Sequence, residues 1–172
     1  MQKTILISGA NSGLGLEAAK QLAKQNHEII LLCRNLEKAN EAKKEIIAFS
    51  NNNNIHIYQA DLSSQKSIEV AATQIKKDFQ KLDVLLNNAG ILASGAFEHI
   101  PLQQQHRLLD VNIKGVLNGC YLAFPYLQQT AKSRVINLCS ASALYGQPSL
   151  AVYSATKFAV RGLTEALDLE WS

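Results

Sequence analysis

Short runs of consecutive apolar residues alternate along the chain with longer segments in which apolar residues recur every three or four positions. Runs that are apolar at consecutive positions predict strands buried on both faces, as in a parallel sheet. Five such runs are present, at Thr4–Ser8, Glu28–Cys33, Ile55–Gln59, Val84–Asn87 and Arg134–Cys139. The pattern therefore indicates a sheet covered on both sides.

The longer segments between these runs have the spacing of amphipathic helices. They are Leu14–Gln25, Leu36–Phe49, Gln65–Phe79, Leu102–Gln129 and Val152–Trp171. We expect the fourth helix to be interrupted or kinked near Pro125, because proline lacks the backbone N–H that a helix interior needs. Strands that alternate with helices predict a doubly wound, Rossmann-like α/β fold with three αβα layers and right-handed crossovers. No linker or repeat divides the chain, so residues 1–172 are predicted to form one domain.

Composition narrows the class of protein. The 172 residues are 47% hydrophobic and 18% charged, which excludes a disordered or low-complexity chain and suits one domain with a sizeable core. The net charge of +3 comes from scattered residues, and no basic cluster is interleaved with aromatic residues. Nucleic acid is therefore not an expected partner.

Cysteine and hydropathy patterns bear on the compartment. Cys33, Cys120 and Cys139 are far apart and lie in apolar runs, so we expect three buried thiols rather than disulfides or a metal site. The N-terminal apolar run is too short for a signal peptide, and no stretch approaches the ~20 apolar residues of a membrane span. We expect a soluble, cytoplasmic protein with no membrane partner.

A glycine-rich turn follows the first predicted strand and precedes the first predicted helix. A dinucleotide pyrophosphate at this position would meet free N–H groups and the positive end of the helix dipole. Gly9 would permit the tight turn, Gly13 the close approach of phosphates, and Gly15 the packing of helix against strand. The alternative is a plain structural turn. The predicted contacts from this turn are Gly9, Asn11, Ser12, Gly13, Leu14 and Gly15.

The ends of the second and third strands bear on the choice of dinucleotide. A carboxylate after the second strand would hold the adenosine 2′-hydroxyl, whereas an arginine accommodates a 2′-phosphate. This chain has Arg34 and no carboxylate there, which favours NADP(H) over NAD(H), although Arg34 could simply face solvent. Asp61 is placed to reach the adenine amino group or, alternatively, to cap the helix that begins at Gln65.

Tyr153 and Lys157 are four residues apart and therefore share one face of the last predicted helix. Reduction of a carbonyl by hydride transfer leaves an alkoxide, and a tyrosine can protonate it when a nearby ammonium and an oxidised nicotinamide favour the phenolate form. Ser140 follows the fifth strand, where ligands bind in open α/β sheets, and could donate to the substrate oxygen. Asn112 is a polar residue within the long apolar helix, either a misfit or a group that kinks the backbone and holds water.

These residues together resemble the short-chain dehydrogenase/reductase family over essentially the whole chain. The family turn matches at Ser8, Gly9, Gly13 and Gly15, its adenine-contacting pair at Asp61–Leu62, and its Asn-Asn-Ala-Gly motif at Asn87, Asn88, Ala89 and Gly90. The resemblance implies a catalytic tetrad of Asn112, Ser140, Tyr153 and Lys157. It further implies that Tyr153 and Lys157 contact the cofactor, with Lys157 on the nicotinamide ribose, and that Asn112 holds a relay water.

The resemblance also implies what lies beyond the fifth strand. Family members continue with a sixth strand, a Pro-Gly turn, a substrate-covering loop and a seventh strand, so we expect a fold that is incomplete at its C-terminal side. The long helix and the last helix pack against a partner subunit in the family, and the last helix of this chain has apolar residues on more than one side. A homo-oligomer is therefore expected.

Two functional hypotheses follow. The first is an oxidoreductase that interconverts a small carbonyl compound and an alcohol with NADP(H), using Tyr153 as general acid and base and no metal. The second is a non-catalytic dinucleotide-binding fragment or redox-sensing module. A third possibility is a fragment that does not fold, which would show no cooperative melting transition.

Overall fold

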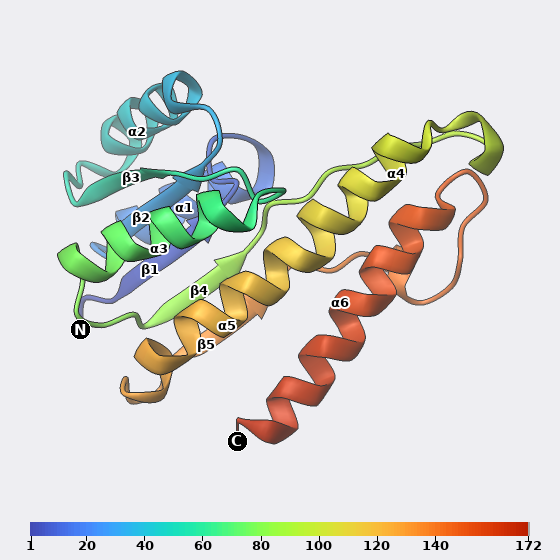
Figure 1. The fold of residues 1–172 in the computed structure, drawn as a ribbon. Coiled ribbons are helices and arrows are strands. Elements are labelled where there is room, and N and C mark those ends of the chain that lie inside the picture. The colour runs from blue at the N-terminus through green and yellow to red at the C-terminus, as the bar shows by residue number, and fades with distance from the viewer. Residues whose placement is uncertain (172) are drawn as a thin grey trace.

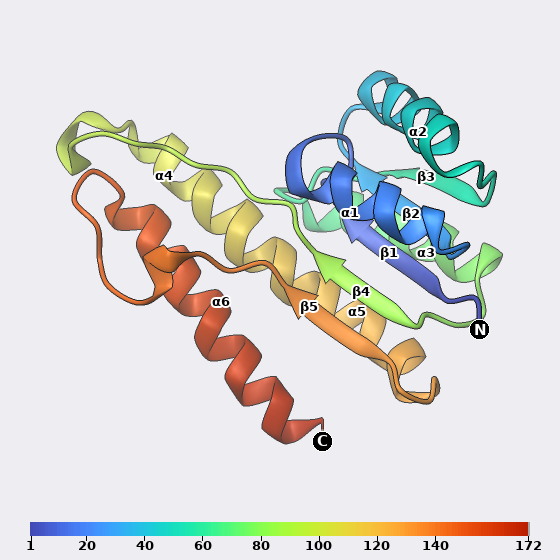
Figure 2. The same cartoon turned by 180° about the vertical axis from the view of Figure 1, so that it is seen from behind.

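The computed structural model describes residues 1–171 and contains a five-stranded parallel sheet with the strand order β3-β2-β1-β4-β5. The strands are β1 (Thr4–Ser8), β2 (Glu28–Cys33), β3 (Ile55–Gln59), β4 (Val84–Asn87) and β5 (Arg134–Asn137). Helices cover both faces of the sheet (Figures 1 and 2). The predicted Rossmann-like αβα fold is confirmed, and β5 ends two residues earlier than predicted.

The helices connect successive strands in the expected order. They are α1 (Gly13–Lys24), α2 (Leu36–Ser50), α3 (Gln65–Asp78), α4 (Leu102–Leu109), α5 (Gly115–Gln128) and α6 (Ala151–Glu170). Short 3-10 turns at Phe97–His99 and Ala141–Ala143 precede α4 and α6. Among residues 1–171, no helix is long and apolar enough to cross a membrane.

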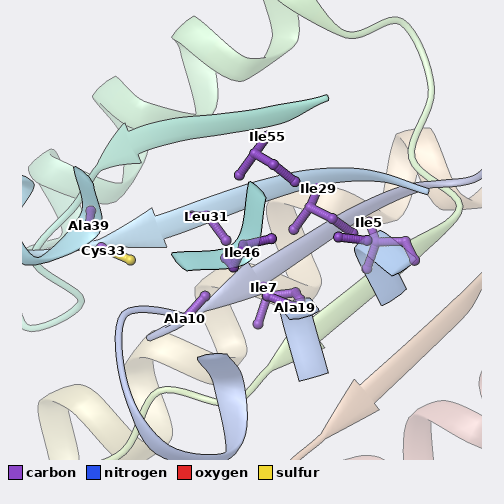
Figure 3. Packing of buried hydrophobic residues seen from close by; sticks show 11 residues of the cluster. Ile5, Ile7, Ala10, Ala19, Ile29, Leu31, Cys33, Ala39, Ile46 and Ile55 are labelled. Atoms are coloured by element: carbon purple, nitrogen blue, oxygen red, sulfur yellow. The ribbon is translucent and has the colours of Figure 1, made fainter. Parts of the chain in front are cut away.

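Alternate residues of the central strands supply two separate cores. On one face, Ile5, Ile7, Ile29 and Leu31 pack against small residues of α1 and against α2 (Figure 3). On the other face, strand residues such as Leu6, Ile30 and Leu85 pack against α3 and α5. Burial on both faces explains why these strands are apolar at consecutive positions.

The long predicted helix is irregular around Asn112, which the sequence offered as a group that could kink the backbone, and is not interrupted near Pro125. A π-helical turn at Asp110–Lys114 joins α4 to α5, whereas Pro125 lies inside α5 without ending it. The predicted interruption near Pro125 is therefore wrong, and a bend of the α5 axis there stays a prediction. Proline removes the N–H that would pair with the Tyr121 carbonyl, but Tyr121 is on the exposed side of α5, where water can replace that donor. The wider π turn places both Val111 and Asn112 in the interior.

A pair of asparagine side chains fixes the contact between β4 and β5. Asn87 and Asn137 are opposite each other in the parallel register. The Asn87 amide donates to the Asn137 Oδ1 at 2.9 Å, and the Asn137 amide donates to Thr164 Oγ1 of α6 at 3.0 Å. This polar chain joins the two strands to the last helix.

The cysteines differ in their surroundings. Cys33 and Cys120 are buried as predicted, but Cys139 is exposed. The prediction of three buried thiols is wrong for Cys139, because β5 has ended before it and the chain is turning towards the 3-10 segment at Ala141–Ala143.

Candidate active site

A cleft of about 430 Å³ opens where β1, β2, β3 and β4 reach their carboxyl ends. Ligands bind at this edge in open α/β sheets. The predicted cofactor residues on its wall are Gly9, Asn11, Ser12, Leu14, Arg34, Asp61, Leu62, Asn88, Ala89 and Gly90. Gly13 and Gly15 belong to the same turn but do not line the cleft. Residues that are far apart in the sequence thus meet at one edge of the sheet.

The glycine turn has the backbone conformation expected of a tight turn. Gly9 and Gly13 have φ angles of +67° and +55°, a region that favours glycine. A methyl group on Gly13 would meet no atom within 4 Å, so this part of the turn faces open space next to the cleft. Ser12 makes no side-chain bond to the first turn of α1. The N–H groups of that turn remain available to an anion.

The turn is tied to the segment that follows β4. Ser8 Oγ accepts hydrogen bonds from the backbone N–H groups of Asn88 and Ala89, both at 3.1 Å. In return, the Asn88 amide donates to the carbonyl oxygens of Ser8 at 2.9 Å and Gly9 at 3.1 Å. The two loops that flank the cleft are therefore held together by reciprocal hydrogen bonds.

Asp61 and Arg34 lie on the opposite wall of the cleft. Partial burial acts to raise the pKa of Asp61, but hydrogen bonds from the Ser63 hydroxyl and amide, together with the positive charges of Arg34 and Arg107, hold it below its usual value. The carboxylate form of Asp61 is thus favoured. Arg34 is exposed at the end of β2.

The residue that caps α3 tests one of the two roles considered for Asp61, namely capping this helix or contacting adenine. Ser64, not Asp61, is the N-cap, and its side chain accepts from the Ser67 backbone N–H. The capping alternative for Asp61 is therefore wrong. Its carboxylate accepts from Ser63 instead and faces the cleft.

Sequence reasoning missed four residues on the wall of the cleft, namely Leu32, Ala60, Ile91 and Val111. Each is directly next to, or two positions from, a residue that was predicted. Their small or aliphatic side chains carry no chemical motif, but adjacency in the sequence was a signal that could have found them.

Tyr153 and Lys157 lie on the same face of α6, as their spacing predicts. The Lys157 ammonium is 5.7 Å from the centre of the Tyr153 ring and donates to the Leu138 carbonyl oxygen at 2.9 Å. It is also close to Gly90, where an added methyl group would lie 3.7 Å from Lys157 Nζ. Gly90 lines the cleft, so the ammonium lies beside the cleft wall, although Asn112, Ser140, Tyr153 and Lys157 are not themselves among the residues that line it.

Ser140 begins the 3-10 turn before α6. Its Oγ accepts from the Ser142 backbone N–H at 3.1 Å and donates to Ser142 Oγ at 3.3 Å. Ser142 is buried and donates to Gln147 Oε1 at 3.0 Å. The long Ser140–Ser142 contact is weak, so a substrate oxygen could replace it as the acceptor for Ser140.

Asn112 occupies the π turn and is 1% exposed. Its Oδ1 accepts from the Ile91 N–H at 2.8 Å, and its amide donates to the Ile91 carbonyl at 2.9 Å. The amide also donates to Thr156 Oγ1 of α6 at 3.2 Å. Asn112 thus lies within the π turn, and its hydrogen bonds connect the segment after β4 to α6, the helix that carries Tyr153.

Burial makes Lys157 a source of pH-dependent stability. Burial lowers the pKa of its ammonium below 10.5, against a smaller opposing effect of Cys139. The unfolded chain then binds more protons than the folded chain between the two pKa values, so stability rises as the pH increases through that window. In the variant Lys157→Met, we expect unfolding free energy at pH 7 no lower than in the wild type, and no such rise up to pH 10.5.

Chemical denaturation at pH values from 7 to 10.5 measures this effect. Lys66→Met is the matched control, because Lys66 is on the exposed surface of α3. A Lys157→Met variant that keeps the wild-type pH dependence would contradict the assignment to Lys157.

Together, the fold and cleft define a Rossmann-like protein with ligand-facing residues at the carboxyl edge of its sheet. Residues 3–172 match the short chain dehydrogenase family. The chain belongs to this family of oxidoreductases. An uncharacterized oxidoreductase of Staphylococcus saprophyticus is 31% identical over 168 residues, which cover 98% of this chain and 67% of that relative. The 3-ketodihydrosphingosine reductase of Bacteroides thetaiotaomicron is 34% identical, over 96% of this chain and 57% of the relative.

Solved structures agree with this assignment. A short chain dehydrogenase from Shigella flexneri, complexed with NADP, has a TM-score of 0.92 and 25% identity, over 98% of this chain and 71% of that one. The chain spans about 60% of the length of an oxidoreductase of Bacillus subtilis and 64% of the D-beta-hydroxybutyrate dehydrogenase of Cupriavidus necator, two further relatives that it matches.

Proposed function

We propose that this protein interconverts a carbonyl compound and an alcohol by hydride transfer with NADP(H). The observation that carries the proposal is the pair of Tyr153 and Lys157, with a buried ammonium 5.7 Å from the phenol ring and beside Gly90 on the cleft wall. A phenol next to a fixed cation is suited to move a proton to and from a substrate oxygen. This arrangement adjoins a cleft with a dinucleotide-type glycine turn.

The residues on the cleft fit a dinucleotide. The open space at Gly13 and the uncapped first turn of α1 suit the phosphates. Asp61 and Leu62 would hold the adenine end, and Asn88, Ala89 and Gly90 would flank the ribose and nicotinamide end. When bound, the nicotinamide supplies the hydride that the side chains of the protein cannot.

Four side chains have roles in the proposed reaction. Tyr153 would protonate the developing alkoxide in reduction and accept its proton in oxidation. Ser140 would donate a hydrogen bond to the same oxygen as negative charge accumulates. Lys157 would contact the nicotinamide ribose and favour the ionised phenol, and Asn112 would hold a water that returns protons to the site.

One assay tests the proposed function. Purified protein is mixed with NADPH and a panel of aldehydes and ketones, and the loss of NADPH absorbance is followed, with calorimetry as a separate measure of binding. We expect turnover with at least one carbonyl compound. Dinucleotide binding without any turnover would point instead to a binding module, and failure to bind any dinucleotide would contradict both hypotheses.

Arg34 supports NADP(H) as the preferred dinucleotide. It lines both the cleft and an adjoining polar pocket, which is also lined by Lys66, Ser64 and Ser67. Two cations and two hydroxyl groups around one pocket suit a 2′-phosphate and outweigh the single carboxylate of Asp61, which lines the same pocket. The Shigella flexneri relative, whose structure contains NADP, is consistent with this choice.

The variant Arg34→Ala should bind NADPH about 10- to 100-fold more weakly, because it loses one charge-assisted contact to the 2′-phosphate. NADH affinity should change little, since NADH lacks that phosphate. Calorimetric titration with both dinucleotides measures the difference. Arg134→Ala is the matched control, because Arg134 is at the start of β5, at the opposite edge of the sheet. An equal loss for NADH and NADPH would contradict a phosphate contact.

We also propose that this protein forms a homo-oligomer. Leu117 and Tyr121 of α5 and Phe158 and Leu169 of α6 are large, exposed apolar side chains. Faces of this kind favour protein–protein contact. We place the homo-oligomer contact on α5 and α6, and light scattering on a gel-filtration peak measures the number of copies.

A further inference from the structure

We infer that Thr156 is a positioning residue, which fixes the Asn112 carboxamide and, through it, the Ile91 backbone at the wall of the cleft. Its catalytic consequence rests on the proposed function. Thr156 lies between Tyr153 and Lys157 on α6, is 0% exposed, and has its hydroxyl directed at Asn112. A hydroxyl this deeply buried cannot contact a ligand in the cleft, so any role in the reaction must act through another residue.

The hydroxyl of Thr156 is fully used. It donates to the Tyr153 carbonyl oxygen at 2.7 Å and accepts from the Asn112 amide at 3.2 Å. The first bond orients the hydroxyl, because its single proton is directed along the helix. A lone pair is then left to receive the Asn112 amide proton.

The carboxamide of Asn112 depends on this acceptor. Asn112 is 1% exposed, and its two amide protons have two partners, the Ile91 carbonyl and Thr156 Oγ1. Without Thr156 Oγ1, one buried N–H would have no acceptor, and the carboxamide would rotate to find another. That rotation would also disturb the bond from the Ile91 N–H to Asn112 Oδ1.

The disturbance would reach the cleft in one step. Ile91 lines the cleft and directly follows Gly90, which adjoins both Asn112 and Lys157. A continuous series of hydrogen bonds therefore runs from Ile91 through Asn112 and Thr156 to the backbone of Tyr153. We expect this series to set the position of the cleft wall relative to the phenol.

The chain offers a matched control two turns further along α6. Thr164 accepts from the Asn137 amide at 3.0 Å and donates to the Val160 carbonyl oxygen at 2.7 Å, which is the same pair of bonds that Thr156 makes. Its partner Asn137 is in β5 and bonds to Asn87 of β4 rather than to Asn112 or Ile91. Thr156→Val and Thr164→Val remove the same kind of bond without a change in side-chain shape.

Hydrogen exchange at the Ile91 amide is a readout that does not need activity. In Thr156→Val, we expect the protection of this amide to fall at least about tenfold, whereas Thr164→Val leaves it close to wild type. Thr156→Ser keeps the hydroxyl and should restore the protection. Equal protection in Thr156→Val and the wild type would overturn the inference, as would an equal fall in both valine variants. If Thr156→Val does not fold, Thr156→Ala removes the same acceptor with less bulk and is measured instead.

Kinetics test the catalytic consequence. For Thr156→Val, we expect kcat to fall about 10- to 100-fold, with NADPH affinity near that of the wild type, because the reacting groups are displaced rather than removed. Thr164→Val should keep its kcat, and Thr156→Ser should recover most of it. A wild-type chain without turnover would count against the proposed function, while the exchange at Ile91 would still decide the role of Thr156. A kcat that falls equally in both valine variants would show that Thr156 acts only through stability.

Discussion

The variant Tyr153→Phe should lower kcat by about 10²- to 10⁴-fold, the contribution expected of a positioned general acid. The substitution removes only the hydroxyl, so the ring that lies 5.7 Å from the Lys157 ammonium remains. Stopped-flow and steady-state assays with NADPH and the best carbonyl substrate give kcat, and calorimetry gives the affinity for NADPH. We expect NADPH affinity to stay within about threefold of wild type. The hydroxyl acts as a proton donor in the transition state and contributes little to the binding of NADPH in the ground state.

The matched control for Tyr153→Phe is Tyr126→Phe. Tyr126 is on α5, where its ring contacts the Lys76 ammonium at 5.5 Å, a contact that phenylalanine preserves. This variant should keep wild-type kcat. If Tyr153→Phe turns over as fast as Tyr126→Phe, the phenol of Tyr153 is not the proton donor.

The second large effect is expected for Gly15→Ala. A methyl group on Gly15 would overlap the Asn88 side-chain amide and lie 2.7 Å from the Gly9 carbonyl oxygen. Asn88 cannot simply move away, because its amide already holds the Ser8 and Gly9 carbonyls. We expect the free energy of unfolding to fall by about 2–3 kcal/mol. NADPH affinity should fall by at least about tenfold, since the loops that flank the cleft would separate.

Chemical denaturation and calorimetry measure both effects, and Gly162→Ala provides the comparison. A methyl group on Gly162 would meet no atom within 4 Å, and this glycine is inside α6. Alanine is the better helix former by about 0.5–1 kcal/mol, so Gly162→Ala should raise stability and leave NADPH affinity unchanged. A Gly15→Ala protein as stable as the wild type would mean that the contact with Asn88 can relax.

The sequence was sufficient to predict the sheet and most of the cleft wall. β1 to β4 begin and end at the predicted residues, because strands buried on both faces give a continuous apolar signal. The positions of Gly9 and Asp61 followed from rules that place ligands at the carboxyl edge of such a sheet, whereas Gly90 came from the resemblance to the family motif. Local patterns carried this information, so no long-range contact had to be known.

Features that depend on contacts between distant residues could not be predicted. The π turn is associated with bonds between Asn112 and Ile91, which are 21 positions apart, and the local sequence offered only a polar residue among apolar ones, which left a misfit and a kink as equal alternatives. Pro125 was the stronger local signal for a kink, but its position on the exposed side of α5 makes the missing N–H tolerable. Likewise, the exposure of Cys139 depends on where β5 ends, which an apolar run does not define.

The facing amides of Asn87 and Asn137 carry a consequence for how β5 finds its correct alignment. Parallel strands have no tight turn to set their alignment, and these two are each only four residues long. A slip of one residue would bring Ile136 or Leu138 opposite Asn87. The buried carboxamide of Asn87 would then have no hydrogen-bond partner, at a cost of about 1–3 kcal/mol. Mispaired arrangements are thereby disfavoured, and one pair of polar side chains selects the correct alignment that apolar contacts alone would leave ambiguous.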